Sequence, residues 1–488
     1  MSIPVGDAEK HAIEKIENVD EGENPHDRTD PVEAKKVLRK IDYRLLPVLM
    51  ALYTTTFLDR VNIGNARLWN MERDLGMKGY QYNIAVLVFY IPLVLFEVPS
   101  NMLLSRLKPR YYISGLCMGW GLTITFMGFA QSYAGLVAAR ILIGVFEAGM
   151  LPGCIYLLGA WYRRHELVTR VSWLFVSNDI AGTISGLLGA GLGSLDGKAG
   201  YSGWQWIFFI EGAMTCLVAV VSFLFLLPFP EQSTFLPAEE KEWLMKRLSA
   251  DDRRRSGEKI GVRGALKALS DWKVLCTGWL YLSVTVAAYA ISIFQPTILS
   301  AFGWSDVKSN LLSAPVRIAS GIFSVSVGIW SDKVGRRGPF CVSGFTVAIV
   351  GNLLVMLVTK SGVRYFGIYV AAIGTYICQP LVLAWGMNQV VGETKRGVTS
   401  AFGAGFGSAG GIVASLVFPK KDAPRYYPGI GTCIAFSFSG IIASCCMWVF
   451  CAWENRAKEQ GKRDHLRRLP EDEQAKLGER HPDFRYTL

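Results

Sequence analysis

The chain alternates between long apolar stretches and shorter polar segments along most of its length. Each apolar stretch holds about 20 residues, the length that an α-helix needs to cross roughly 30 Å of hydrocarbon. The pattern therefore predicts an all-α membrane protein with twelve transmembrane helices. The predicted spans are 45–66, 80–104, 111–131, 134–160, 171–194, 205–228, 273–299, 310–330, 340–358, 365–388, 398–418 and 430–453.

A charged segment divides the predicted spans into two groups of six. We expect two six-helix lobes, joined by a central loop and flanked by polar tails. Within the central loop, a proline followed by acidic and then basic residues (237–247) is typical of a short amphipathic helix. The expected domains are the N-terminal tail 1–44, the first lobe 45–228, the central loop 229–270, the second lobe 271–453 and the C-terminal tail 454–488.

The two halves carry related features at matching places. The segment GIWSDKVGRRG (328–338) follows the eighth span, and NMLLSRLKPR (101–110) follows the second. The fifth and eleventh spans are both rich in glycine, which lets helices approach closely in lipid. Matching loops on two six-helix lobes predict parallel repeats around a binding site near the middle of the membrane.

Composition agrees with a membrane protein and indicates its orientation. Hydrophobic residues make up 51% of the chain and charged residues 19%, with a net charge of +11. Lysine and arginine are most frequent in the tails and the central loop, and such positive segments stay on the cytoplasmic side. We therefore expect both termini in the cytoplasm. The positive charge then reflects this asymmetry, and no nucleic-acid partner is expected.

Charged residues are rare inside the predicted spans, and most of them fall in the first half. A charge in hydrocarbon costs a few kcal/mol or more unless it is paired or hydrated, so such residues mark an internal cavity. Counting from the span ends places Asp59 and Arg140 at similar depths, roughly 9 Å below the outer boundary, and Glu147 near the midplane. The charged residues well inside the spans are Asp59, Arg60, Glu97, Arg140, Glu147, Asp179, Glu211 and Arg317.

The grouping of carboxylates with arginines suggests a chemistry for this cavity. Burial favours the protonated form of a carboxyl group, whereas a neighbouring arginine favours its charged form. If Asp59 takes up a proton, Arg60 or Arg140 is free to bind a carboxylate through two hydrogen bonds. Protonation and anion binding then favour each other, as symport requires. The alternative is a static salt bridge that locks the first helix to the fourth.

Several other residues in the spans are open to more than one role. Glu97 and Glu211 fit best as structural carboxylates, with a gate as a second possibility for Glu97. Arg317 could contact a second anion or extend its side chain to the outer surface. Polar and aromatic residues at suitable depths are further candidates for substrate contacts: Tyr90, Asn178, Gln295, Trp385 and Asn388.

Other classes of function lack their signatures. The chain has no GxxxxGK[ST] motif, which argues against an ATP-driven pump. A GxGxxG match (405–410) lies inside a predicted span with no preceding strand, so we expect no dinucleotide cofactor. The ten cysteines all fall within predicted spans, without the spacing of metal ligands. We expect no enzyme activity, no cofactor and no metal.

The segment GIWSDKVGRRG resembles the loop signature of the major facilitator superfamily, which lies between the second and third helices of a lobe. In such a loop, a carboxylate and arginines at helix ends can latch neighbouring helices in one conformation and release them in another. The first-half copy has Ser105 in place of the aspartate, so no latch is expected there. The matching residues of this predicted gating loop are Gly328, Asp332, Gly335, Arg336 and Arg337.

Further segments resemble the fungal allantoate and nicotinate permease branch of the anion:cation symporter family, and the resemblance covers about residues 40–488. The segments are LDRVNIGNARL (58–68), LFEVPSN (95–101), ARILIGVFEAGMLPG (139–153), GWQWIFFIEG (203–212), NQVVGETKRG (388–397), DAPRY (422–426) and HPDFRYTL (481–488).

This resemblance implies a secondary transporter that imports a small organic anion with protons at the fungal plasma membrane. It gives Asp59 and Glu147 proton-carrying roles and places Arg60 on the negative charge of the substrate, and we expect Arg140 to join it. The alternatives are an exporter of an anionic metabolite and a nutrient receptor on the same fold. We expect the organic anion, protons and the lipid bilayer as partners, and a monomeric protein.

Overall fold

The computed structural model describes residues 31–104, 107–162, 164–255, 268–391, 393–468 and 477–488, and every regular element in these ranges is a helix. The chain divides into two compact units, Met1–Pro47 and Val48–Leu488, and each is described by itself. The described residues of the first unit form the start of α2 (Pro31–Leu68), and the second unit contains the remainder of that helix and all later ones.

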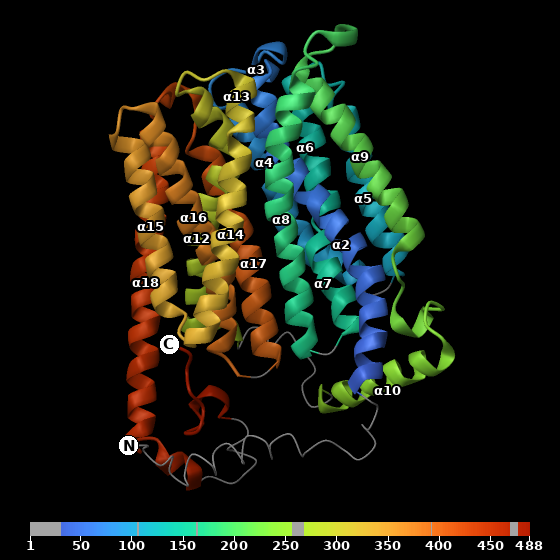
Figure 1. Ribbon diagram of the computed structural model, residues 1–488, viewed down its shortest axis with the longest axis vertical. Coiled ribbons are helices and arrows are strands. Elements are labelled where there is room, and N and C mark those ends of the chain that lie inside the picture. Colours follow the sequence, from blue (N-terminus) through green and yellow to red (C-terminus); the bar gives the residue numbers. More distant parts are fainter. Residues whose placement is uncertain (1–30, 105–106, 163, 256–267, 392, 469–476) are drawn as a thin grey trace, which may run out of the picture. The chain divides into compact units, whose positions relative to one another are not determined.

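Most residues of the twelve predicted spans are helical, although the helices and the spans do not correspond one to one (Figure 1). In the first half they are α2, α3 (Met71–Asp74), α4 (Gln81–Leu104), α5 (Pro109–Met127), α6 (Tyr133–Glu147), α7 (Met150–Trp161), α8 (Arg164–Gly193) and α9 (Gly203–Phe225). In the second half they are α12 (Trp272–Ser300), α13 (Asp306–Leu311), α14 (Ser313–Val334), α15 (Gly338–Leu357), α16 (Ser361–Asn388), α17 (Glu393–Leu416) and α18 (Tyr427–Glu459). The helix α10 (Ala238–Arg255) lies between the two halves in sequence.

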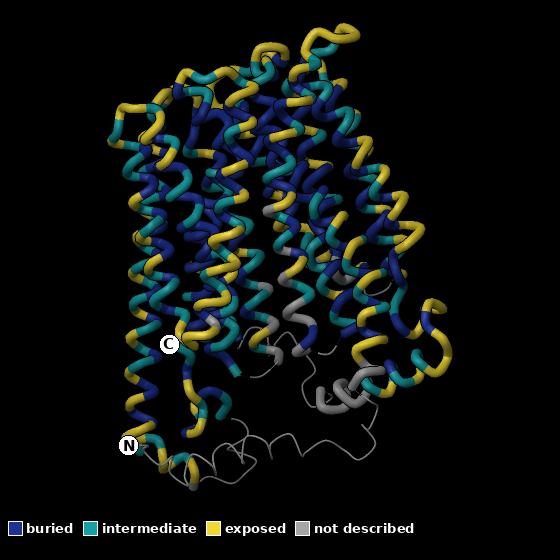
Figure 2. Tube along the Cα trace, in the orientation of Figure 1, coloured by how far each residue is buried: buried dark blue, intermediate teal, exposed yellow. Residues whose placement is uncertain are grey.

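Seven helical stretches among the described residues are long and apolar enough to cross a membrane. Many large apolar side chains on the helices are exposed. Figure 2 marks exposed residues in yellow along the helices. Apolar surface of this extent marks a surface that contacts a membrane. The protein is therefore a multi-pass membrane protein. The seven stretches are Tyr133–Trp161, Gly203–Phe225, Trp272–Ser300, Asp306–Ser331, Gly338–Leu357, Ser361–Asn388 and Tyr427–Glu459.

Local sequence sets where several helices begin. The side chain of Ser132 accepts a hydrogen bond from the backbone N–H of Gly135 at 3.3 Å, at the start of α6. Asp271 accepts from the backbone N–H of Lys273 at 2.9 Å, at the start of α12. These acceptors satisfy backbone donors that have no partner within the helix. The helix α10 confirms the short helix predicted in the central loop, since it begins directly after Pro237 and has acidic residues in its first turn.

The helices pack mainly within each half. In the first half α5 lies against α9 and α4 against α6, and in the second half α12 lies against α17 and α15 against α16. Contacts between the halves are made by α4 with α17 and by α8 with α13 and α14. Two groups of helices that pack internally and meet along a few helix pairs leave room for a cavity between them.

The two halves meet closely at the end of the helices where α3 and α13 lie, at the top of Figure 1. The Asn83 side chain donates to the carbonyl oxygen of Ser415 at 2.5 Å, and Lys420 forms an ion pair with Glu72 at 2.8 Å. At Gly64, α2 touches α12 so closely that a Cβ would overlap a backbone carbonyl oxygen of α12. These contacts close this end of the second unit.

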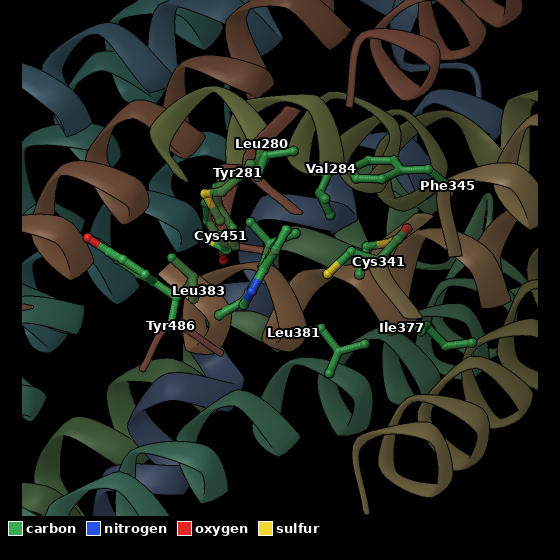
Figure 3. Packing of buried hydrophobic residues seen from close by; sticks show 14 residues of the cluster. Leu280, Tyr281, Val284, Cys341, Phe345, Ile377, Leu381, Leu383, Cys451 and Tyr486 are labelled. Carbon is green, nitrogen blue, oxygen red and sulfur yellow. The ribbon is translucent and has the colours of Figure 1, made fainter. Parts of the chain in front are cut away.

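The C-terminal segment (477–488) packs against the other end of the second half. Tyr486 is 5% exposed and belongs to a cluster of buried apolar side chains from α12, α15, α16 and α18 (Figure 3). Its backbone N–H and C=O both pair with the Asn455 side chain at 2.9 Å. The carbonyl oxygen of Thr487 accepts from the indole of Trp385 at 2.9 Å. The segment is therefore an integral part of the packed structure.

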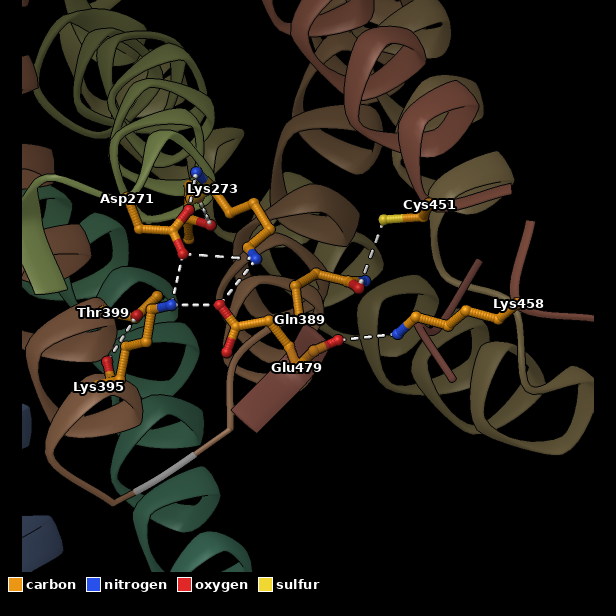
Figure 4. Close-up of polar contacts among 9 residues, drawn as sticks. Asp271, Lys273, Gln389, Lys395, Thr399, Cys451, Lys458 and Glu479 are labelled. Carbon is orange, nitrogen blue, oxygen red and sulfur yellow. Dashed lines mark hydrogen bonds and ion pairs between the residues drawn. The ribbon is translucent and has the colours of Figure 1, made fainter. Parts of the chain in front are cut away.

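A cluster of four charged residues ties this segment to the first residues of α12 and α17 (Figure 4). The Lys273 ammonium lies 3.0 Å from Glu479 and 3.4 Å from Asp271, and Lys395 forms ion pairs with both carboxylates. Burial alone would raise the pKa of each carboxyl group. The hydrogen bonds and positive charges of the lysines outweigh it, holding the pKa of Asp271 at about 2 and that of Glu479 below its ordinary value.

We expect Glu479→Gln to destabilise the protein by roughly 1 to 3 kcal/mol, because it removes a charged acceptor shared by two lysines. Since the pKa of Glu479 is lowered by folding, its contribution is present above the ordinary value of 4.5 and is lost as the pH falls below it. Thermal unfolding in detergent should show a lower midpoint for the variant at pH 7, with a smaller difference at acidic pH. Glu459→Gln, at an exposed site on α18, is the control, and equal midpoints at pH 7 would contradict the docking.

Gly64→Ala tests the closed end of the molecule. The added methyl group has no room beside α12, and overpacking of this kind costs about 1 to 3 kcal/mol. We expect a lower midpoint of thermal unfolding in detergent. Gly115→Ala is the matched control, because it also lies in a helix but has open space at its Cβ position. If both variants behave like the wild type, the contact is not required.

Candidate functional site

A cavity lies between the two halves and encloses about 810 Å³ of empty space, part of it continuous with solvent. Residues from α2, α4, α6, α7, α8, α12, α16 and α17 line it, so both halves contribute. The polar lining residues are Tyr53, Arg60, Glu97, Glu147, Asn178, Tyr281, Thr285, Tyr289, Ser292, Tyr376, Gln379 and Ser408.

Arg60 and Glu147 form an ion pair on the wall of this cavity, through Nε and a carboxylate oxygen. The side chain of Glu147 is 1% exposed and that of Arg60 is 12% exposed. Arg60 also donates to the hydroxyl of Tyr289 at 3.4 Å, and its guanidinium lies 5.7 Å from the ring centroid of Phe89. The Glu147 carboxylate is thus buried, whereas the Arg60 guanidinium is partly exposed to the cavity and contacts Tyr289 of the second half.

Asp59 precedes Arg60 in sequence but lies in a different environment, because successive residues of a helix point about 100° apart. One of its carboxylate oxygens accepts from the indole of Trp120 at 3.0 Å and from the hydroxyl of Thr215 at 3.2 Å. The other oxygen is buried and has no hydrogen-bond partner among the described residues. Asp59 is 5% exposed and lies outside the cavity lining.

Arg140 and Glu147 lie two turns apart on the same buried face of α6. Arg140 is 2% exposed, and its Nε and Nη2 have no hydrogen-bond partner in the described part of the chain. The carboxylates of Asp59 and Glu147 act on it electrostatically. Asp59 and Arg140, predicted at similar depths, form no ion pair with each other, and the hydrogen bonds of Asp59 come from α5 and α9.

A glycine brings α6 close enough to α4 to enclose the ion pair. At Gly144, one turn before Glu147, a Cβ would overlap the carbonyl oxygen of Phe89 on α4. The ring of Phe89 in turn faces the Arg60 guanidinium. A small residue at this position therefore allows α4 to cover the pair with an aromatic side chain.

The wall from the second half carries hydroxyl and amide groups. Tyr289 and Ser292 lie one turn apart on α12, and Tyr376 and Gln379 lie one turn apart on α16. Arg317 of α14 is 2% exposed and hydrogen-bonds to two of these groups, so its side chain does not extend to the outer surface. This wall can accept and donate hydrogen bonds but carries no acidic residue among the described lining residues.

Three of the predicted substrate contacts lie in or near a cavity. Asn178 lines the central cavity. Tyr90 is 1% exposed, and its ring centroid lies 5.2 Å from that of Tyr289, at the edge of the same cavity. Gln295 lines a separate and mostly apolar cavity of about 430 Å³ in the second half. The side chain of Asp179 lies outside the described part of the chain.

The other two predicted contacts lie away from the cavity. Trp385 is fully buried, and its indole donates to the C-terminal segment. Asn388 is the last residue of α16 and is likewise outside the cavity lining. Both residues sit at the end of the second half that the C-terminal segment covers.

The predicted gating loop connects α14 and α15. Gly335 has φ +67°, a left-handed conformation that favours glycine. The backbone N–H of Arg337 donates to the carbonyl oxygen of Leu488 at 2.5 Å, so the loop touches the C-terminal segment. The side chain of Asp332 lies outside the described part of the chain, and the latch stays a prediction.

Sequence reasoning missed most of the second-half wall, although its spacing could have revealed it. The polar residues on α12 recur every three or four positions, which places them on one face of the helix. Glu97, interpreted above as structural, also borders the cavity. The missed residues are Tyr53, Tyr281, Thr285, Tyr289, Ser292, Tyr376, Gln379 and Ser408.

A buried ion pair beside a polar cavity, enclosed by membrane-spanning helices and closed at one end, is typical of a membrane transport protein. Comparison with known proteins establishes the family. The model of the Major Facilitator Superfamily matches residues 49–415, and the chain belongs to this superfamily of membrane transporters.

Several fungal transporters are similar to the chain over nearly their whole length. The MFS-type transporter cnsO of Penicillium expansum is 33% identical, covering 93% of this chain and 90% of its own length. The major facilitator-type transporter hxnP of Emericella nidulans is 32% identical, covering 94% of each chain. The MFS-type transporter efuF of Hormonema carpetanum is 30% identical, covering 88% of each chain.

A solved structure shares the fold. It is a bacterial homolog of the human lysosomal transporter Spinster in an inward-facing and occupied conformation, with a TM-score of 0.64 and 16% sequence identity. The similarity covers 86% of this chain and 97% of that chain.

Proposed function

We propose that the protein imports a small organic anion together with protons by alternating access, through twelve transmembrane helices in two six-helix lobes. The observation that carries this proposal is the buried Arg60–Glu147 pair on the wall of the central cavity. A guanidinium already charged and held in a low-dielectric wall is suited to bind a carboxylate. Its present partner is a carboxylate that a proton can neutralise.

Proton and substrate act on the same arginine. When Glu147 is ionised, it occupies Nε of Arg60 and satisfies the buried charge. When Glu147 takes up a proton, Arg60 loses its counter-ion, and leaving it unpaired in this environment costs several kcal/mol. A substrate carboxylate in the cavity then restores the pairing. Anion binding and protonation therefore stabilise each other, which is the thermodynamic requirement for symport.

Asp59 and Arg140 extend this system behind the cavity wall. Asp59 accepts hydrogen bonds from neutral donors only, and it acts on Arg140 together with Glu147. We assign Asp59 a second proton-carrying role. When Asp59 is ionised, it shares the positive charge of Arg140 with Glu147, and when Asp59 is protonated, Arg140 stabilises the ionised form of Glu147 more strongly. Arg140 thereby contributes to substrate binding indirectly, through the shared carboxylate.

The closed end of the molecule supports a state that opens toward the opposite end. Contacts at Gly64 and between Asn83 and Ser415 block the end where α3 and α13 lie. With both termini in the cytoplasm, as the charge distribution indicates, this state faces the cytoplasm. Similarity to fungal transporters supports a fungal membrane, and we propose the plasma membrane and a monomer surrounded by lipid.

Uptake in proteoliposomes tests this function. Purified protein with radiolabelled nicotinate, allantoate and short dicarboxylates as probes should accumulate at least one of them when the proton gradient is directed inward. Glu147→Gln should abolish accumulation but retain exchange, because a permanently neutral side chain leaves Arg60 able to bind the anion without releasing a proton. Asp59→Asn should also lose proton-driven accumulation. Glu459→Gln, remote from the cavity, is the control.

The outcomes separate the proposal from its rivals. Wild-type accumulation by Glu147→Gln would show that this carboxylate does not couple proton and anion. Transport stimulated by an outward-directed proton gradient would identify an exporter. Binding of the anion without any flux, in either direction, would support a receptor.

A further inference from the structure

We propose that Arg317 is a second anion contact and that the substrate carries two acidic groups a few carbons apart, as in a short dicarboxylate. This inference rests on the proposed function, since it assigns a substrate class to the same cavity. It concerns a residue in the second half, on the side opposite Arg60.

Arg317 is a buried charge without an acidic partner among the described residues. It is 2% exposed, and its guanidinium donates to the hydroxyl of Ser292 at 2.5 Å and to the hydroxyl of Tyr376. It also lies 4.7 Å from the ring centroid of Tyr376 and 5.7 Å from that of Phe57. Neutral dipoles and aromatic rings hold this charge, but none of them neutralises it.

The groups that hold Arg317 belong to the cavity wall. Ser292, Tyr376 and Phe57 all line the central cavity. A substrate in the cavity therefore meets the hydroxyl groups to which Arg317 donates. In the proposed anion complex, the guanidinium turns from these hydroxyls toward the anion.

Arg60 and Arg317 approach neighbouring positions of the same helix. Arg60 donates to Tyr289, and Arg317 donates to Ser292, three residues further along α12. Three residues correspond to about 4.5 Å along a helix axis. Phe57, which faces Arg317, likewise lies three residues from Arg60 on α2. The two cations thus lie beside adjacent turns of helices that line one cavity, and the proposal is that two acidic groups on a short carbon chain bridge them.

The charges around the cavity favour a dianion. Arg60 has a carboxylate partner, Glu147, whereas Arg317 has none in the described part of the chain. An anion with one charge would therefore leave one arginine unmatched once Glu147 is protonated. The remaining carboxylate of the lining, Glu97, lies against Gly405 of α17 and forms no ion pair with Arg317. A substrate that bridges Arg60 and Arg317 would also draw the two halves together around it.

A buried arginine elsewhere in the same half provides the contrast. Arg364 of α16 also lacks an acidic partner among the described residues, but it donates to the backbone carbonyl oxygens of Val355 and Pro424 at 3.0 and 3.2 Å. It does not border the central cavity. Arg364→Gln is therefore a control for the loss of a buried arginine without the loss of a cavity contact.

The test compares straight-chain dicarboxylates of four to six carbons with their monoamides, which have the same size but one charge fewer. Binding is measured on purified full-length protein by calorimetry. We expect at least one dicarboxylate to bind about tenfold or more tightly than its monoamide. Arg317→Gln should weaken dicarboxylate binding by about tenfold or more and leave the monoamide unchanged, while Arg317→Lys should recover part of the difference. Arg364→Gln should preserve the ratio.

Other outcomes overturn the inference in distinguishable ways. If monocarboxylates bind with a dependence on Arg60 and Arg317→Gln changes nothing, Arg317 is structural and the proposed function stands. The same holds if Arg317→Gln weakens dicarboxylate and monoamide equally. If no carboxylate of either kind binds with a dependence on Arg60, both the inference and the proposed function fail. Size-exclusion profiles and the Arg317→Lys variant show whether each protein is folded.

Discussion

A guanidinium or carboxylate inside a membrane is stable only where another charge, a hydrogen-bond donor or water replaces the hydration that it has lost. The ion pair between Arg60 and Glu147 compensates each residue for its lost hydration, and the packing of the surrounding helices makes this pair possible. The helix α2 must lie within hydrogen-bonding distance of α6, and Gly144 lets α4 approach from the side. In the proposed mechanism, the cavity beside Arg60 is where another anion takes over the role of Glu147.

The other buried charged residues differ in whether an opposite charge or only neutral groups compensate for their lost hydration. Asp59 is held by an indole and a hydroxyl, and Arg317 by two hydroxyls, so neither is neutralised by a charge among its described contacts. The cluster around Glu479, by contrast, consists of two carboxylates and two lysines that neutralise one another. Matched charges of this kind fix the C-terminal segment in place. Unmatched charges near the cavity are free to respond to a proton or an anion.

Sequence reasoning indicated the long membrane helices and named charged residues for the candidate site, but it did not give the partners of those residues. Apolar stretches of membrane length predict the long helices, and the cost of buried charge selects a group of residues that includes Arg60 and Glu147. Depth along a helix does not give the direction in which a side chain points, which is why Asp59 and Arg140 lie at similar depths without bonding. Trp385 has a suitable depth as well, but the C-terminal segment occupies the space beside it.

The missed residues have a physical explanation too. Serine in a membrane span is common, since its hydroxyl can bond to the backbone of its own helix, and tyrosine is common where its ring packs among apolar side chains. Tyr289, Ser292 and Tyr376 therefore carry no distinct signal in isolation. Only the packing of α12 against the first half shows that they face a cavity shared with Arg60. The latch predicted at Asp332 stays a prediction for a related reason, because it depends on side-chain contacts that sequence does not specify.

Proton uptake on anion binding tests the exchange at Arg60 most directly. A pH-indicator dye in weakly buffered detergent solution reports the protons that the purified protein takes up when a binding anion is added. The wild type should take up about one proton for each anion bound through Glu147, and Glu147→Gln should bind the anion with that uptake removed. Undiminished proton uptake by Glu147→Gln at full anion occupancy would contradict the proposed coupling.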